Sequence, residues 1–98
     1  MKENAFQAWL IRELKDRLPG CLVLKNDATY IQGIPDLTVL YGSRWAALEV
    51  KASPRARQQP NQQHYIDRLD EMSFAAFIYP ENAEEILDAL CTTLEPGW

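Results

Sequence analysis

The stretch that decides the fold is GIPDLTVLYGSRWAALEVK, residues 33–51. It contains two apolar runs, Leu37–Tyr41 and Trp45–Leu48, that are typical of buried β-strands. Only Gly42 and Ser43 are needed to turn between them, and glycine at the first central position suits a two-residue type II′ turn. The stretch therefore predicts a β-hairpin with charged residues at its open end.

The register of this hairpin places two carboxylates together. If Gly42 and Ser43 form the turn, Tyr41 faces Arg44, and counting back pairs Asp36 with Glu49 on one face of the sheet. Two bare carboxylates about 5 Å apart repel by roughly 3 kcal/mol at an effective dielectric constant near 20. Lys51, two residues beyond Glu49, leaves the same face but offsets only part of that repulsion. A bulge would shift the pairing by one residue.

A divalent cation would remove the repulsion. Carboxylates and backbone carbonyls are hard oxygen donors, which favour Mg²⁺ or Mn²⁺ over Zn²⁺. Cys21, Cys91 and His64 lie far from this cluster in the sequence and lack zinc-like spacing. We expect a magnesium or manganese site here; the alternative is a hairpin with solvated charges at its end.

The motif Gly-Ile-Pro-Asp followed by Glu-Val-Lys resembles the PD-(D/E)xK nuclease superfamily, with Asp36, Glu49 and Lys51 as its three signature residues. With Gln62 it is most similar to the VRR-NUC family, in particular its short stand-alone members of phages and bacteria. The resemblance covers most of the chain, from Glu3 to about Tyr79. It implies that Asp36, Glu49 and the Val50 carbonyl hold one or two Mg²⁺ or Mn²⁺ ions.

Two further site residues lie on predicted helices. Glu3 falls within the arc of Phe6, Leu10, Ile11 and Leu14, and the resemblance implies that it completes the metal site through water. It could instead serve the helix dipole or face solvent, and Glu13 is the weaker choice.

Gln62 shares a face with Ile66 and Leu69 on the helix that follows Pro60-Asn61, whereas His64 projects nearly opposite. The resemblance assigns Gln62 to the site, where it could bond a phosphate, a water or Lys51. A helix-start amide that bonds the local backbone is the competing interpretation, and Gln63 replaces Gln62 if the helix phase is off by one.

The rest of the chain supplies a scaffold. Residues 21–24 and 75–79 are predicted to form buried strands, and Asn82 opens a last helix. The order is helix, strand, hairpin, helix, strand, helix, which predicts an α/β domain over residues 1–98: a mixed sheet flanked by helices that resembles the restriction-endonuclease-like core. We expect Trp98 to be frayed. Small size and the resemblance both favour a homodimer.

The charge distribution bears on the partner. The net charge of −4 argues against general nucleic-acid binding, but the segment from Arg44 to Arg57 has four basic residues against the single Glu49. We expect DNA, including branched DNA, to contact the following side chains: Lys25, Asn26, Tyr30, Arg55 and Arg57. No long apolar run, signal pattern or cysteine framework is present, so we expect a cytoplasmic protein of a bacterium or phage-infected cell, with no membrane partner and no nucleotide cofactor.

The sequence thus predicts a Mg²⁺- or Mn²⁺-dependent, structure-selective endonuclease that hydrolyses phosphodiester bonds, either resolvase-like on four-way junctions or directed to flaps and nicks. Lys51 would orient the attacking water or stabilise the transition state. Two alternatives stay open: a catalytically inactive or partner-dependent nucleic-acid-binding module on the same fold, and an unrelated interaction protein whose motif is coincidental.

Overall fold

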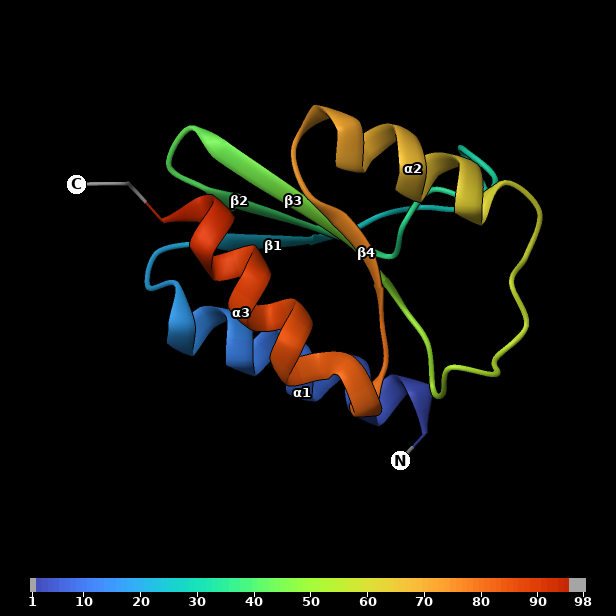
Figure 1. The fold of residues 1–98 in the computed structure, drawn as a ribbon, viewed down its shortest axis with the longest axis horizontal. Coiled ribbons are helices and arrows are strands. Elements are labelled where there is room, and N and C mark those ends of the chain that lie inside the picture. The colour runs from blue at the N-terminus through green and yellow to red at the C-terminus, as the bar shows by residue number, and fades with distance from the viewer. Residues whose placement is uncertain (1, 96–98) are drawn as a thin grey trace.

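A computed structural model describes residues 2–95, and the expectation for Trp98 lies outside them. The helices and strands follow one another in this order: α1 (Glu3–Arg17), β1 (Leu22–Lys25), β2 (Leu37–Tyr41), β3 (Arg44–Val50), α2 (Gln62–Met72), β4 (Ala75–Ile78), the short 3-10 helix η1 (Pro80–Asn82) and α3 (Ala83–Leu94). The predicted α/β class is confirmed (Figure 1).

The four strands form one mixed sheet in the order β1-β2-β3-β4. Strand β2 is antiparallel to both β1 and β3, whereas β4 lies parallel to β3. A parallel neighbour requires a crossover connection, and α2 with the loop before it supplies that connection. The two outer strands, β1 and β4, are the edges of the sheet.

The predicted hairpin has the predicted register. Tyr41 pairs with Arg44, and the ladder runs to Leu37 opposite Leu48. Gly42 has a φ of +60°, and Ser43 is not among the residues with positive φ, as a type II′ turn requires. Asp36 directly precedes the first residue of this ladder and Glu49 directly follows Leu48, so both carboxylates lie at the open end of the hairpin.

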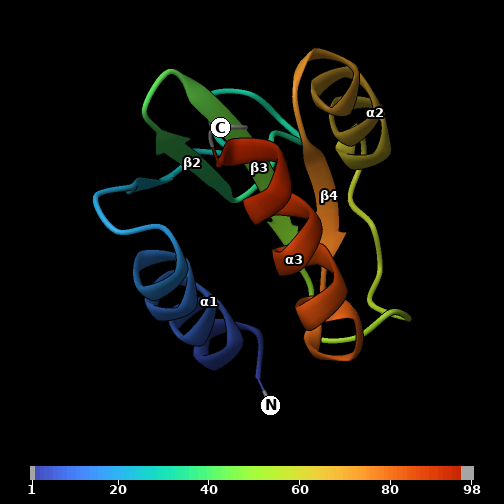
Figure 2. The ribbon, with the colours of Figure 1, turned by 60° about the vertical axis from the view of Figure 1, so that its left-hand side comes forward.

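Helices cover the sheet from both sides (Figures 1 and 2). On one face, α1 and α3 bury the main core, which includes Phe6, Leu10, Leu48 and Leu87. On the other face, α2 packs over β3 and β4 through a small cluster around Ala47, Ile66 and Ala75. Because side chains alternate along β3, Glu49 lies on the α2 face with Ala47.

The α2 helix leaves part of its face of the sheet uncovered. Leu22 and Leu24 on the edge strand β1 are 61% and 46% exposed. The prediction that residues 21–24 form a buried strand is therefore wrong for these two leucines. Only Cys21, next to α1, is fully buried among these four residues.

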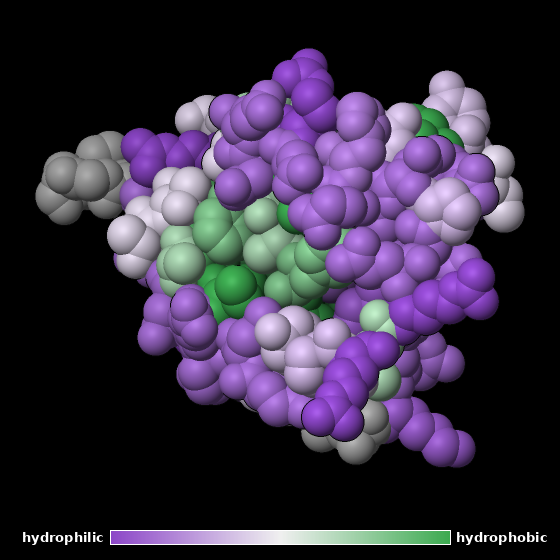
Figure 3. Space-filling model, turned by 45° about the vertical axis from the view of Figure 1, so that its right-hand side comes forward, coloured by the Kyte–Doolittle hydropathy of each residue, from purple (hydrophilic) through white to green (hydrophobic). Residues whose placement is uncertain are grey.

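A second apolar area lies along β4, between α2 and α3, and is green in Figure 3. The half-buried side chains of Phe74 and Ala76, at β4, and of Ile86, on α3, pack against the main core. Across residues 2–95, no helix is both long enough and apolar enough to cross a bilayer.

Candidate metal and nucleic-acid site

The candidate site lies where the open end of the hairpin meets the start of α2. Among residues 2–95, the buried polar or charged side chains are Glu49, Lys51 and Gln62, which are 3%, 7% and 8% exposed. Burying ionised groups is costly unless they are paired and hydrogen-bonded. Their gathering at one place is thus the most unusual feature of this small core.

Gln62 joins the two charged groups. Its Nε2 donates to Glu49 Oε2 at 2.9 Å, and its Oε1 accepts from Lys51 Nζ at 2.8 Å. The Lys51 ammonium also lies 3.6 Å from Glu49 Oε2. Gln62 is buried, while Gln63 and His64 are exposed, so the predicted helix phase is correct. Of the alternatives left open, Gln62 bonds Lys51 and also the local backbone, because its Oε1 accepts from the Gln59 N–H.

The Asp36 carboxylate is fixed by the backbone of the neighbouring strand. Its Oδ2 accepts a hydrogen bond from the Val50 N–H at 2.9 Å. The N–H and C=O of one strand residue point towards the same neighbouring strand. The Val50 carbonyl, which the family resemblance implies is a metal ligand, therefore lies on the side of β3 that faces Asp36.

Glu49 carries the electrostatic signature of the site. Burial, reinforced by the negative charge of Asp36, raises the pKa of Glu49 from 4.5 to about 7, against the opposing effect of Lys51. Its second oxygen, Oε1, is buried and has no hydrogen-bond partner among the described residues. An unsatisfied buried polar atom costs about 1–3 kcal/mol, so a ligand for this oxygen would be stabilising.

The glycine of the Gly-Ile-Pro-Asp motif has a packing role. Gly33 has a φ of +91°, and a Cβ built there would lie 2.6 Å from Asn61 Cβ and 2.8 Å from the Pro60 carbonyl oxygen. Only glycine allows this approach. The contact sets the loop that leads to Asp36 directly against the residues that precede Gln62.

The structure does not bring Glu3 together with Asp36 and Glu49. Glu3 is exposed, which corrects the expectation that it shares the buried stripe of α1. No group of three or more His, Cys, Asp and Glu side chains suited to a metal ion is found within residues 2–95. Glu3 is kept away from the two carboxylates because α1 packs on the face of the sheet opposite to Glu49. The start of α1 does lie at the same end of the molecule as the segment leaving β3 (Figures 1 and 2).

The predicted nucleic-acid contacts fall into two groups. Lys25, Tyr30, Arg55 and Arg57 are exposed, Tyr30 by 84%, and are thus available to a partner. Asn26 is engaged within the fold: its Nδ2 donates to the Pro35 carbonyl at 2.9 Å and to Thr38 Oγ1 at 2.8 Å. The Asn26 side chain thus fixes the segment around Asp36. This structural role explains the asparagine at this position without any contact to a ligand.

The sequence did not predict a contact that the backbone of the loop after β3 makes with the site. The Arg57 carbonyl accepts from Lys51 Nζ at 3.1 Å, which ties this loop to the buried ammonium. Backbone donors and acceptors occur at every residue, so no residue type could have signalled this contact.

Comparison with known proteins adds no relative: no protein-family model matches the chain, and neither the curated proteins nor the solved structures give a match. Functional inference therefore rests on the motif and on the geometry described above.

Proposed function

We propose that this protein is a divalent-metal-dependent nuclease that hydrolyses phosphodiester bonds in DNA. The observation that carries the proposal is the buried, unpartnered Oε1 of Glu49 beside the carboxylate of Asp36. Two carboxylates held close together in a poorly solvated place repel each other. A cation between them would remove that repulsion and supply the missing partner for Oε1.

The donor set fits magnesium. Mg²⁺ commonly keeps several waters and binds through one or two carboxylates together with substrate phosphates. Asp36 and Glu49 would hold the ion, with the Val50 carbonyl as a further oxygen donor, and Mn²⁺ suits the same ligands. Glu3 could contribute only through water from the first turn of α1. When bound, the cation would polarise the scissile phosphate and acidify the attacking water.

The protein's own residues would position the reaction. Gln62 holds the Lys51 ammonium beside Glu49 at the edge of the carboxylate pair. From there Lys51 can orient the attacking water or stabilise the negative charge that develops on the phosphate. Arg55, Arg57 and Lys25 are exposed and would contact neighbouring phosphates. Hydrolysis adds water across one P–O bond and leaves a phosphate and a hydroxyl terminus.

The family proposal rests on the same features. The Gly-Ile-Pro-Asp motif leads directly into β2, the Glu-Val-Lys motif lies at the end of β3, and Gln62 opens the next helix. This arrangement supports a restriction-endonuclease-like core of the VRR-NUC type. We assign the protein to the cytoplasm of a bacterium or phage-infected cell, where such a substrate is found.

We further propose that the protein acts as a homodimer. A chain of 98 residues buries a limited core, and the apolar area along β4 in Figure 3 would be covered by a second copy. Sedimentation equilibrium of the purified protein tests this. A single monomeric species at micromolar concentration would contradict it.

The second candidate is a nucleic-acid-binding module that has lost catalysis or requires a partner subunit. The observation that favours it is the involvement of Lys51 in contacts with Gln62, Arg57 and Glu49, which leaves its ammonium occupied within the fold. Such a module would bind DNA without cleaving it.

A cleavage assay decides between the two. Purified protein is incubated with four-way junction, flap, nicked and linear DNA in Mg²⁺ or Mn²⁺, alongside the variants Asp36→Ala and Lys51→Ala. We expect metal-dependent cleavage that falls at least about a hundredfold in each variant, with unchanged circular dichroism. Binding without cleavage by the wild-type protein would favour the second candidate, and full activity of either variant would refute the residue assignment.

A further inference from the structure

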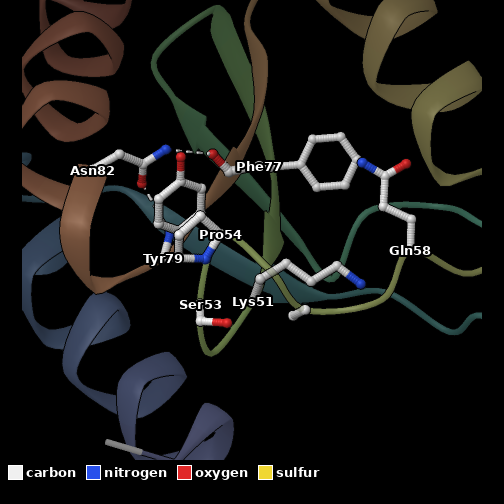
Figure 4. A pocket seen from close by; sticks show the side chains of 8 residues that line it. Lys51, Ser53, Pro54, Gln58, Phe77, Tyr79 and Asn82 are labelled. Carbon is white, nitrogen blue, oxygen red and sulfur yellow. Dashed lines mark hydrogen bonds between the residues drawn. The ribbon is translucent and has the colours of Figure 1, made fainter.

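A pocket of about 370 Å³ opens beside Lys51, beneath the loop that follows β3. Figure 4 shows Phe77 and Tyr79 on β4 and its C-terminal continuation, with Gln58 across from them on the loop. Asp36, Glu49 and Gln62 do not line it. The pocket therefore adjoins the candidate metal site through Lys51 but is separate from it.

The register of the sheet fixes the position of this pocket relative to the carboxylates. Phe77 is the partner of Glu49 across the parallel β3–β4 pair, and the Asp36 carboxylate lies on the other side of β3, where it accepts from the Val50 N–H. The backbone continues in the same way, since the Lys51 N–H donates to the Ile78 carbonyl at 2.9 Å. Adjacent strands lie about 4.8 Å apart. Asp36 and the pocket thus lie on opposite sides of Glu49.

The wall of the pocket is built and held in place. Asn82 Oδ1 accepts from the Tyr79 N–H at 2.9 Å, and Asn82 Nδ2 donates to the Phe77 carbonyl at 3.2 Å (Figure 4). These bonds fix the backbone that carries both aromatic rings. The Asn82 amide is engaged in these bonds, so the groups available to a ligand include the two aromatic side chains, the Ser53 hydroxyl and the exposed Gln58.

The lining favours one class of ligand. Aromatic side chains present flat apolar surfaces on which nucleobases stack, and every base has such a face. An amide can donate to and accept from the polar edge of a base. Lys51 lines the pocket with its donors already engaged by Gln62 and Arg57, so its positive charge, rather than a free hydrogen bond, would attract the phosphate of the same or the adjoining nucleotide. A nucleotide has a flat base with a polar edge and carries a phosphate, so it matches each of these features.

We propose that this pocket binds the base of an unpaired nucleotide next to the phosphate held at Lys51. The proposal rests on the proposed nuclease function and specifies its substrate. A base inside a stacked, paired duplex cannot enter a recess walled by a loop and a strand unless it leaves the stack. The preferred substrate is therefore DNA that offers an unpaired nucleotide at the cleavage position, as single-stranded or branched DNA does.

A binding experiment with a fluorescent base tests this directly. The probe is a single-stranded oligothymidine that carries one aminopurine, a fluorescent base that is quenched on stacking, titrated with protein in Ca²⁺ buffer. For the wild-type protein we expect saturable quenching. Phe77→Leu keeps an apolar side chain but removes the ring, and we expect it to weaken binding about tenfold and to reduce the quench.

Two further variants control for folding. Tyr41→Leu alters another half-buried aromatic residue, at the turn end of the hairpin, which does not line the pocket, and should bind the probe as the wild-type protein does. Gln58→Ala changes an exposed loop residue without loss of core, and should weaken binding about two- to tenfold.

The outcomes separate the pocket from the nuclease proposal. Absence of quenching with the wild-type protein, or equal binding by wild type, Phe77→Leu and Tyr41→Leu, overturns the pocket even if DNA is cleaved in Mg²⁺. Selective loss in Phe77→Leu and Gln58→Ala supports the pocket. That support stands even if the wild-type protein cleaves no DNA, a result that would defeat the nuclease proposal alone.

Discussion

The Gln62 side-chain amide donates to Glu49 Oε2 at 2.9 Å, and this single bond links the first turn of α2 to the carboxylate at the end of β3. The same amide accepts from Lys51. A neutral side chain thus holds an acid and a base of the candidate site at a set distance. Gln62 acts as a positioning residue, and several of the expectations below follow from it.

Replacing Gln62 tests this positioning role. Gln62→Ala leaves Glu49 Oε2, Lys51 and the Gln59 N–H without their partner, so we expect a stability loss of about 1–3 kcal/mol by urea unfolding. Cleavage should fall about 10–100-fold, in kcat more than in KM. Gln63→Ala is the matched control, because Gln63 is exposed and should change neither quantity. Equal effects of the two substitutions would contradict the role of Gln62.

Gly33 and Gly20 form a matched pair of glycines. Both have φ near +90°, but a Cβ at Gly20 meets nothing within 4 Å, whereas one at Gly33 meets Asn61 and Pro60. We expect Gly20→Ala to lower the free energy of unfolding by about 1–2 kcal/mol through backbone strain alone. Gly33→Ala should lower it by about 2–5 kcal/mol and should also reduce cleavage, since the start of α2 must move. Thermal melts and cleavage assays check this, and equal losses in the two variants would exclude the contact.

The raised pKa of Glu49 predicts how stability depends on pH in metal-free protein. The folded state keeps the proton up to about pH 7, whereas the unfolded chain releases it near 4.5. The contribution of this group is therefore fully present below pH 4.5 and is lost as pH rises through about 7.

The variant Glu49→Gln isolates this effect. A glutamine can still accept from Gln62, and its own N–H groups can reach towards Asp36, without any charge to titrate. We expect its stability relative to the wild-type protein to improve by about 1–3 kcal/mol between pH 4.5 and pH 8 in the presence of a chelator. A stability difference that stays constant over this range would show that Glu49 ionises normally.

The exposed arginines of the loop predict the salt dependence of DNA binding. Arg55→Ala and Arg57→Ala should each weaken affinity, and the slope of log K against log salt should fall by about one per residue removed. Fluorescence anisotropy with labelled DNA in Ca²⁺ measures this. Arg68→Ala, on α2 and paired with Glu71, is the control and should leave the slope unchanged. A slope that does not respond to the loop variants would remove this loop from the interface.

The sequence was most informative where local rules determine geometry. The Gly42-Ser43 turn set the register of the hairpin and hence placed Asp36 and Glu49 together at its open end, and helical periodicity predicted that Gln62 is buried and His64 exposed. Turn type and helical phase depend on a few adjacent residues. They can therefore be predicted without knowledge of the remaining chain.

Features that depend on distant parts of the chain were not predictable in this way. Leu22 and Leu24 are exposed because α2 does not extend over β1 on its face of the sheet, and Glu3 does not join Glu49 because α1 packs on the opposite face. The pocket at Phe77 exists because β4 pairs in parallel with β3, which no local pattern specifies. The Gly33–Asn61 contact likewise joins segments far apart in sequence.

Calorimetric titration of the metal-free protein with Mn²⁺ tests the central claim most directly, with Glu49→Gln and Asp36→Asn as matched variants. We expect saturable binding by the wild-type protein and affinity at least about tenfold weaker in either variant. All three proteins should keep the same circular dichroism spectrum. Absence of Mn²⁺ binding by the folded wild-type protein, or binding unchanged in both variants, would contradict a cation held between Asp36 and Glu49.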